Sequence, residues 1–247
     1  MNENLKKNSF WVGGKFTVFE IIKRERREIL QIAIHEKNKD YLKKFNKKNI
    51  RYKIEGDRFF NKLFKNDIDI HQGFAAEVMP LKNIDLNEKL KNLDKNSIFL
   101  ILDGISDSRN IGSIIRSSAA LGCDAILIEK KKYNPKSNIM FRSASGMTEL
   151  VDVIPVININ NSIDVLKKNN FWIYGMSANA NKNIMQTKFS NRSAFVFGSE
   201  TNGMKNLVQK NCDELIKIQI NKEVESLNIS NAVSITLAIA NNKNWEL

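Results

Sequence analysis

The chain has 247 residues, of which 42% are hydrophobic, and its formal net charge is +12. This length allows one large or two small domains with a sizeable core, and the positive charge favours a polyanionic partner such as nucleic acid. Two isolated cysteines, two histidines and no apolar stretch of bilayer length argue against a metal site, a Ser-His-Asp hydrolase and a membrane protein.

The amino-terminal part carries most of the excess charge, since residues 1–96 hold 22 Lys+Arg against 14 Asp+Glu. A Lys- and Asn-rich composition caused by genome bias is the alternative explanation. A polar tail at 1–9, which we expect to be disordered, shows no secretory signal, and the isolated cysteines fit a reducing cytoplasm.

Short strands and helices alternate after this tail. A turn at 10–15 should lead into a helix carrying Val18, Ile21 and Ile22 and ending in the basic run 23–27. Further expected elements are strands at 29–34 and 50–54, a basic helix at 37–48, a helix around 59–64 and a strand opened by 71–78. This pattern predicts a small α/β module over residues 10–84, and its charge makes it the part that faces nucleic acid.

A polar stretch at 85–96 separates this module from a second predicted domain at 97–247. Apolar strand candidates lie at 98–102, 125–128, 153–157, 171–174, 194–197 and 215–218, and helices at 111–121, 162–168, 206–211 and 231–240. Buried strands that alternate with helices predict a mostly parallel sheet covered on both faces.

Three polar segments, 103–116, 198–204 and 221–231, each follow a strand and precede a helix. They can therefore meet at one edge of the sheet, where open α/β sheets keep their sites. Each segment also has a plain structural interpretation. Asn110, Ser108, Ser226, Asn228 or Ser230 could cap a helix, Gly198 and Gly203 could serve tight turns, and Arg116 could be a solvated charge.

Taken together, the three segments resemble the three signature motifs of the SpoU branch of the SPOUT RNA methyltransferases. The first, Asn-x-Gly-(x)3-Arg, is met by Asn110, Gly112 and Arg116; the second, Gly-x-Glu-x-x-Gly-Met, by 198–204. The third, Glu-Ser-Leu-Asn-(Val/Ile)-Ser, is met by 225–230. The sequence departs from the family at 218–221, Ile-Gln-Ile-Asn, where relatives often have Ile-Pro-Met, but no proposed catalytic side chain changes.

The resemblance implies an α/β fold with a deep trefoil knot. The hydrophobic periodicity of a sequence cannot show a knot, and protein chains rarely adopt one. It also implies a homodimer that binds S-adenosylmethionine, with a second subunit completing each site. Backbone around Gly198, Gly203, Ile218 and Leu227 would hold the cofactor, and no metal is implied. Ile218 could equally be an ordinary core residue of its strand.

The implied chemistry is methyl transfer from a sulfonium to a ribose 2′-hydroxyl, the group that distinguishes RNA from DNA. Arg116 matches the family's catalytic arginine. Because a guanidinium keeps its proton to about pH 12 or beyond, binding a phosphate and stabilising alkoxide character is an easier role than general base. Asn110, Glu200, Ser226 and Asn228 would orient Arg116, the ribose and the cofactor, and Glu200 could pair with Arg116.

The amino-terminal module, with His71-Gln72-Gly73, resembles the ribosomal-protein-like RNA-binding domain of 23S rRNA guanosine-2′-O-methyltransferases. The predicted substrate is therefore a guanosine in the peptidyl-transferase region of 23S rRNA, with neither DNA nor a membrane as partner. Two alternatives remain: a tRNA or antibiotic-resistance type rRNA 2′-O-methyltransferase, and a catalytically silent RNA-binding assembly factor.

Overall fold

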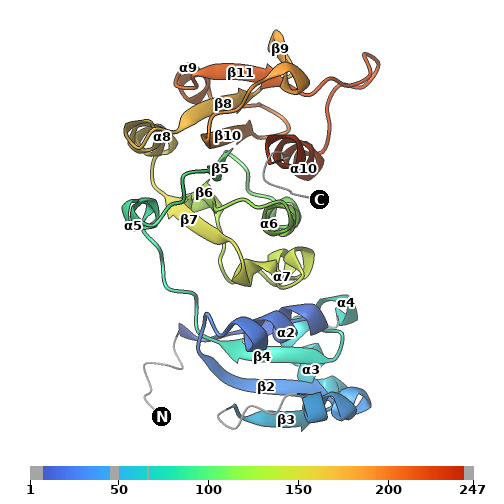
Figure 1. Ribbon diagram of the computed structural model, residues 1–247. Helices are drawn as coiled ribbons and strands as arrows, with labels where there is room; N and C mark the ends of the chain where they lie inside the picture. The colour runs from blue at the N-terminus through green and yellow to red at the C-terminus, as the bar shows by residue number, and fades with distance from the viewer. Residues whose placement is uncertain (1–7, 45–49, 66, 242–247) are drawn as a thin grey trace. The chain divides into compact units, whose positions relative to one another are not determined.

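The computed structural model describes residues 8–44, 50–65 and 67–241 (Figure 1). Two compact units emerge: unit 1 comprises Met1–Lys82 and Asn134–Glu149, and unit 2 comprises Asn83–Tyr133 and Leu150–Leu247. The division after Lys82 lies beside the predicted linker, whereas the sequence analysis left 134–149 inside the second domain. Residues 1–7 of the expected tail and 45–49 of the expected basic helix lie outside the described residues.

Unit 1 is built on a four-stranded sheet of order β1-β4-β2-β3, in which β2 and β3 are parallel and the other pairs antiparallel. Its strands are β1 (Phe10–Gly13), β2 (Ile29–His35), β3 (Tyr52–Glu55) and β4 (Phe74–Val78). Its helices are α2 (Lys15–Arg24), α3 (Asp57–Phe64), α4 (Ile68–His71) and α7 (Asn138–Ala144), with 3-10 turns η1 (Glu36–Lys44) and η3 (Met147–Glu149).

Three expectations for unit 1 are wrong in detail. Residues 10–13 form a strand because they pair with β4, and the turn falls at Gly14, whose φ is 108°. The basic stretch is a 3-10 helix in its described part, since its polar residues offer an α-helix little surface to bury. His71 ends α4 instead of opening a strand, and its ring stacks on Phe60 and Phe64.

Unit 2 is a seven-stranded sheet of order β7-β6-β5-β10-β8-β11-β9, and all its neighbouring strands pair in parallel. The prediction of a mostly parallel sheet is therefore confirmed. The strands are β5 (Ser97–Asp103), β6 (Ala125–Glu129), β7 (Asp152–Val156), β8 (Trp172–Met176), β9 (Lys182–Asn183), β10 (Arg192–Gly198) and β11 (Glu214–Lys217).

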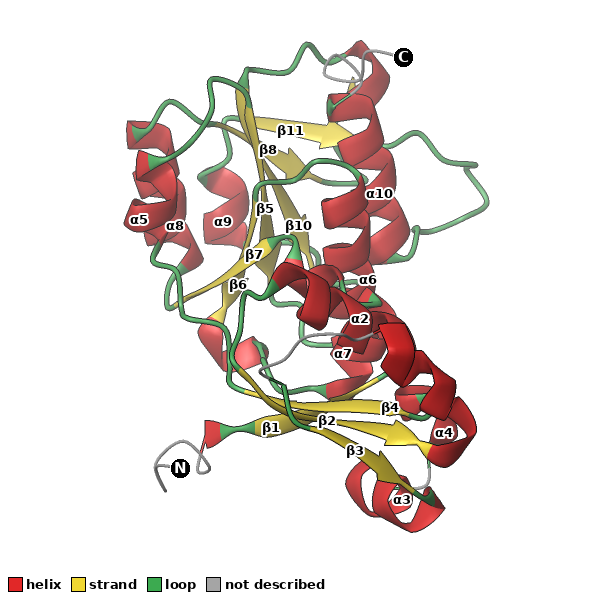
Figure 2. Cartoon of the chain, turned by 60° about the horizontal axis from the view of Figure 1, so that its bottom comes forward, coloured by secondary structure: helices red, strands yellow, loops and turns green. Residues whose placement is uncertain are grey.

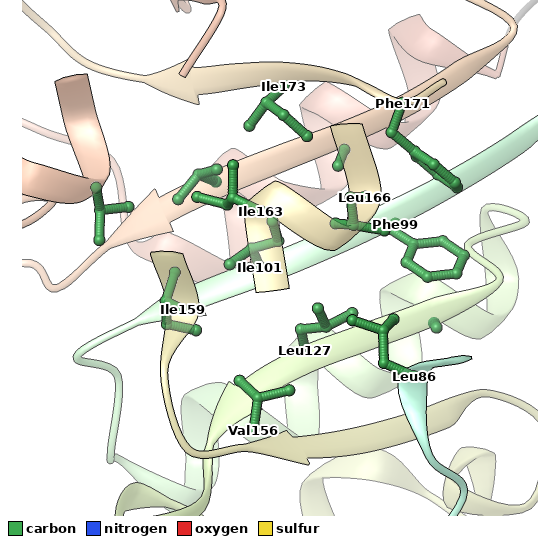
Figure 3. Close-up of a cluster of buried hydrophobic side chains, with 14 of the residues drawn as sticks. Leu86, Phe99, Ile101, Leu127, Val156, Ile159, Ile163, Leu166, Phe171 and Ile173 are labelled. Carbon is green, nitrogen blue, oxygen red and sulfur yellow. The ribbon is translucent and has the colours of Figure 1, made fainter. Parts of the chain in front are cut away.

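Helices cover both faces of this sheet (Figure 2). On one face lie α5 (Leu86–Lys91), α8 (Ile159–Lys168) and α9 (Asn206–Lys210); on the other lie α6 (Ser108–Ala120) and α10 (Ile229–Ala240). The 3-10 turns η2 (Lys130–Lys132) and η4 (Ile184–Gln186) complete the unit. Figure 3 shows the core beneath α8, where Ile163 and Leu166 pack with Phe99, Leu127 and Ile173.

Burial accounts for the chemistry of both cysteines. Cys123 and Cys212 are free thiols, and burial raises the pKa of each to about 12.

Among the described residues, no cluster of His, Cys, Asp and Glu could hold a metal ion, and no helix is long and apolar enough to cross a membrane. The trefoil knot stays a prediction.

Candidate functional site

The first polar segment begins helix α6, and its cap is Asp107. The Asp107 Oδ1 atom accepts hydrogen bonds from the backbone N–H groups of Arg109 (2.7 Å) and Asn110 (2.9 Å). The interpretation of Ser108 or Asn110 as the cap is therefore wrong. Asn110 lies in the first turn of α6, and its side chain serves other contacts.

Those contacts join the three polar segments, as the sequence predicted. Asn110 Nδ2 donates to Glu200 Oε1 (3.4 Å), and Asn228 Nδ2 donates both to Asn110 Oδ1 (3.1 Å) and to Glu200 Oε1 (3.2 Å). The backbone N–H of Ile229 donates to the same Glu200 oxygen at 3.1 Å. One carboxylate and two amides thus connect the carboxyl end of β10 to the first turns of α6 and α10.

Helix α10 explains why a carboxylate suits this position. Asn228 caps the helix, and its Oδ1 accepts from the backbone N–H (2.9 Å) and the hydroxyl (2.6 Å) of Ser230. The cap interpretation of Asn228 is therefore correct alongside the network. Glu200 receives a backbone N–H of the first turn, where the helix dipole favours negative charge. This interaction holds Glu200 at the amino end of α10.

The second polar segment is a tight turn that follows β10. The backbone N–H groups of Ser199 and Gly203 each donate to the other residue's carbonyl oxygen, at 3.1 and 2.8 Å. The chain returns so closely that a Cβ on Gly198 would lie 2.0 Å from the carbonyl carbon of Gly203 and the nitrogen of Met204. Gly203 has φ 63° and open space around its Cα. Of these two glycines, only Gly198 is required for close packing.

A cavity of about 190 Å³ opens beside this turn. Six of the predicted site residues line it: Gly198, Glu200, Gly203, Ile218, Ser226 and Leu227. Further lining residues that the sequence analysis missed are Met176, Ser177, Ala178 and Lys217, which follow or end neighbouring strands of the same sheet. Their position after an apolar run was the available signal.

Arg116 is the predicted site residue that stands apart. It lies on α6, six positions beyond Asn110, with an exposed side chain, and it is not among the described residues that line the cavity. The Glu200–Arg116 pair stays a prediction, whereas the contacts from Glu200 to Asn110, Asn228 and Ile229 are present.

A charge cluster of two buried carboxylates and one partly exposed lysine was also missed. Lys205 Nζ donates to Asp103 Oδ1 (2.7 Å) and Glu129 Oε1 (2.9 Å). Burial opposes the charged form of Glu129, but the hydrogen bond and the charge of Lys205 outweigh burial and lower the pKa of Glu129. Burial likewise opposes the lysine's charge, yet the two carboxylates raise the pKa of Lys205. The sequence analysis placed Asp103 only at the start of the first polar segment.

Replacing Gly198 with alanine should weaken cofactor-site binding. The added Cβ would collide with backbone atoms, so the turn must shift at a cost of about 1–3 kcal/mol. Calorimetry should then show a loss of roughly tenfold or more in the affinity for S-adenosylhomocysteine. Gly203→Ala is the matched control, since it adds the same methyl group in open space and costs only the left-handed backbone strain of about 1 kcal/mol. Equal affinities for the two variants would contradict the close-packing argument.

Known proteins resemble this chain in sequence and in fold. The model of the SpoU rRNA Methylase family matches residues 97–238. The chain is 36% identical, over 177 residues, to the 23S rRNA (guanosine-2′-O-)-methyltransferase RlmB of Haemophilus influenzae, covering 70% of this chain and 72% of that protein. RlmB of Escherichia coli K12 is also 36% identical, over 176 residues, with the same coverage.

A solved structure shares the fold across both units. The SpoU methyltransferase AviRb from Streptomyces viridochromogenes, in complex with AdoMet, aligns with a TM-score of 0.81 at 18% identity, covering 99% of this chain and 94% of that one. The structural similarity to AviRb supports the fold, whereas the family match and the RlmB relatives support membership of the family. This chain belongs to the SpoU rRNA methylase family.

Proposed function

We propose that the chain is an S-adenosylmethionine-dependent 23S rRNA guanosine-2′-O-methyltransferase. The observation that carries this proposal is the network of Asn110, Glu200 and Asn228, which joins all three motif segments beside a cavity. The relatives named for this activity cover most of the chain. A silent assembly factor would have no need to keep a charged side chain in this network.

The cavity residues fit S-adenosylmethionine. Ile218, Leu227 and Ile229 offer apolar surface for an adenine ring, and the Gly198–Gly203 turn exposes backbone that can approach a ligand closely. Glu200 and Glu225 also line the cavity, and their carboxylates suit a cationic sulfonium. When bound, the cofactor supplies an electrophilic methyl group. Gly198, Gly203, Ile218 and Leu227 are the residues that we assign to holding it.

The chain's own residues then prepare the ribose. Arg116 binds the neighbouring phosphate and stabilises negative charge on the 2′-oxygen, because its guanidinium stays protonated and cannot act as a base near neutral pH. Asn110 and Asn228, fixed by Glu200, and Ser226 at the cavity present hydrogen-bonding groups that orient the ribose and the cofactor. A positioned hydroxyl reacts faster because orientation is fixed beforehand.

A homodimer accounts for the position of Arg116. The arginine lies outside the cavity of its own protomer, so a second subunit can bring it to the neighbouring site. Helix α10 is apolar on more than its buried face: Ile235 and Ala238, at helical spacing with Asn231, are exposed. This stripe beside α6 is our proposed dimer contact.

The amino-terminal unit supplies RNA affinity in this proposal. Residues 1–96 carry 22 Lys+Arg against 14 Asp+Glu, and such an excess attracts phosphate backbones irrespective of sequence. We therefore assign residues 10–84 to rRNA binding and residues 97–247 to catalysis. The proposed place of action is the cytoplasm. Neither DNA nor a membrane is assigned as partner.

Mapping of 2′-O-methyl groups in total RNA tests the proposal. Cells lacking the gene should lose one guanosine methylation in the peptidyl-transferase region of 23S rRNA, and the plasmid-borne gene should restore it. A missing methyl group in tRNA, or at another rRNA nucleotide, would favour the alternative substrates. An unchanged methylation map, together with no methyl transfer by purified protein to 23S rRNA, would overturn the enzyme assignment.

A further inference from the structure

We propose that Asp103, Glu129 and Lys205 form a positioning cluster that holds the two loops carrying Asn110 and Glu200 in register for methyl transfer. The expected effect on the rate of methyl transfer rests on the proposed function, whereas the effect on the two loops rests on the geometry alone. None of the three residues belongs to the motif residues assigned above to catalysis or cofactor binding.

One ammonium group joins the ends of two strands to the segment that follows the turn after β10. Asp103 ends β5 and Glu129 ends β6; their side chains are 0% and 8% exposed, and both accept from Lys205 Nζ. Asp103 Oδ2 also accepts the backbone N–H of Lys205 at 2.7 Å. The lysine is therefore held at its side chain and its main chain, directly after the turn that follows β10.

The cluster reaches both loops. Glu129 Oε2 accepts the backbone N–H of Gly104 at 3.2 Å, and Gly104 opens the loop that leads to Asn110. On the other side, the Ser199–Gly203 turn carries Glu200 at its tip and is followed by buried Met204 and then Lys205. Shifting Lys205 would therefore move the base of the Glu200 turn, and shifting Glu129 would move the start of the Asn110 loop.

The charges make this arrangement specific to a cation. Two carboxylates that contact one ammonium repel each other once it is removed, and a buried carboxylate without its partner takes up a proton or draws in water. Lys131 Nζ lies 3.8 Å from Glu129 Oε1, beyond hydrogen-bond distance, whereas Lys205 Nζ lies 2.9 Å from the same oxygen, so Lys131 compensates Glu129 only weakly. A neutral side chain at 205 cannot replace the connection.

The alternative role for the same contacts is local: Lys205 occupies the N-cap position of α9, although its side chain makes no capping hydrogen bond there, and its ion pairs with Asp103 and Glu129 hold the start of this helix against the sheet. That role would affect the stability of a five-residue helix and leave the loops in place. The two roles differ in what they predict for the Ser199–Gly203 turn and for catalysis.

The test compares Lys205→Met with Lys205→Arg and with Lys182→Met in the full chain. Lys182 forms a separate lysine–glutamate pair, 2.6 Å from Glu214, that touches neither loop. A displacement of about 1 Å at a reacting site can cost ~10²-fold in rate. We therefore expect Lys205→Met to lower kcat about 10- to 100-fold, to weaken S-adenosylhomocysteine binding about tenfold and to speed amide exchange of Ser199 and Gly203 about tenfold.

Lys205→Arg should recover kcat and exchange protection to within about threefold of wild type, because a guanidinium can bind both carboxylates. Lys182→Met should leave all three measurements within about twofold, since the Lys182–Glu214 pair touches neither loop. Wild-type exchange rates and S-adenosylhomocysteine affinity in folded Lys205→Met would overturn the inference in favour of the local role at the start of α9. If wild-type protein methylates no rRNA, the proposed function fails while the exchange and binding measurements still decide the cluster.

Discussion

Arg116→Ala should lower kcat for 2′-O-methylation of 23S rRNA by about 10²–10³-fold, the usual cost of removing one stabilising donor from a developing oxyanion. The reason is that, in the proposed mechanism, the lost guanidinium contacts the phosphate and the alkoxide and not the cofactor. Arg116 does not line the cavity, so the affinity of the protein for S-adenosylhomocysteine should stay within about twofold of wild type. Single-turnover methyl transfer and calorimetry measure the two quantities separately.

Arg109→Ala provides the matched control for this variant. Arg109 is another exposed arginine on α6, and its loss removes the same charge from the same helix. A general attraction to RNA phosphates predicts equal, salt-dependent losses for both variants, mainly in KM. A selective fall in kcat for Arg116→Ala supports the proposed role, and equal behaviour of the two variants would contradict it.

The parallel sheet could be predicted from sequence because its strands are apolar on both faces. Residues 98–102 form a continuous apolar run, and the strand that contains them is fully buried. The site could be anticipated because three polar segments follow such strands. Their meeting through Glu200 then required only that the strands be parallel, which places all three carboxyl ends at one edge.

Finer features of the site depend on contacts that local composition does not encode. Ser108, Asn110 and Asp107 are all good cap residues, and only the backbone path makes Asp107 the cap of α6. Asp103 followed by glycine has the composition of a turn, yet it is buried because Lys205, about a hundred residues later, neutralises it. Such long-range partners are invisible to periodicity.

Unit 1 shows the same limit in its basic run at 23–27. The run has the composition of a solvated surface, but the Arg27 side chain is 3% exposed. Its Nε and Nη2 atoms donate to the two oxygens of Glu149, at 3.1 and 2.6 Å, and Glu149 is fully buried. This pair explains why 134–149 joins unit 1, although the sequence placed it in the second domain.

Arg27→Met should lower the free energy of unfolding of unit 1 by about 3–5 kcal/mol, because it leaves the Glu149 carboxylate buried with the Thr148 hydroxyl (3.0 Å) in place of its charged partner. Urea unfolding measures the change through the fluorescence of Trp11, which packs against Phe59, in a chain whose other tryptophans, Trp172 and Trp245, are replaced by phenylalanine.

Two comparisons separate the loss of a buried partner from the loss of a positive charge. Arg24→Met removes the neighbouring exposed pair with Glu20 (3.2 Å) and should cost at most about 1 kcal/mol. The double variant Arg27→Met, Glu149→Met replaces both charges by apolar groups and should be more stable than Arg27→Met alone, because no buried charge is left unpaired. If Arg27→Met costs no more than Arg24→Met, the Arg27–Glu149 pair does not hold segment 134–149 in unit 1. If the double variant is as unstable as Arg27→Met alone, the packing of the arginine on the Phe141 ring, whose centroid lies 5.4 Å away, matters more than its charge.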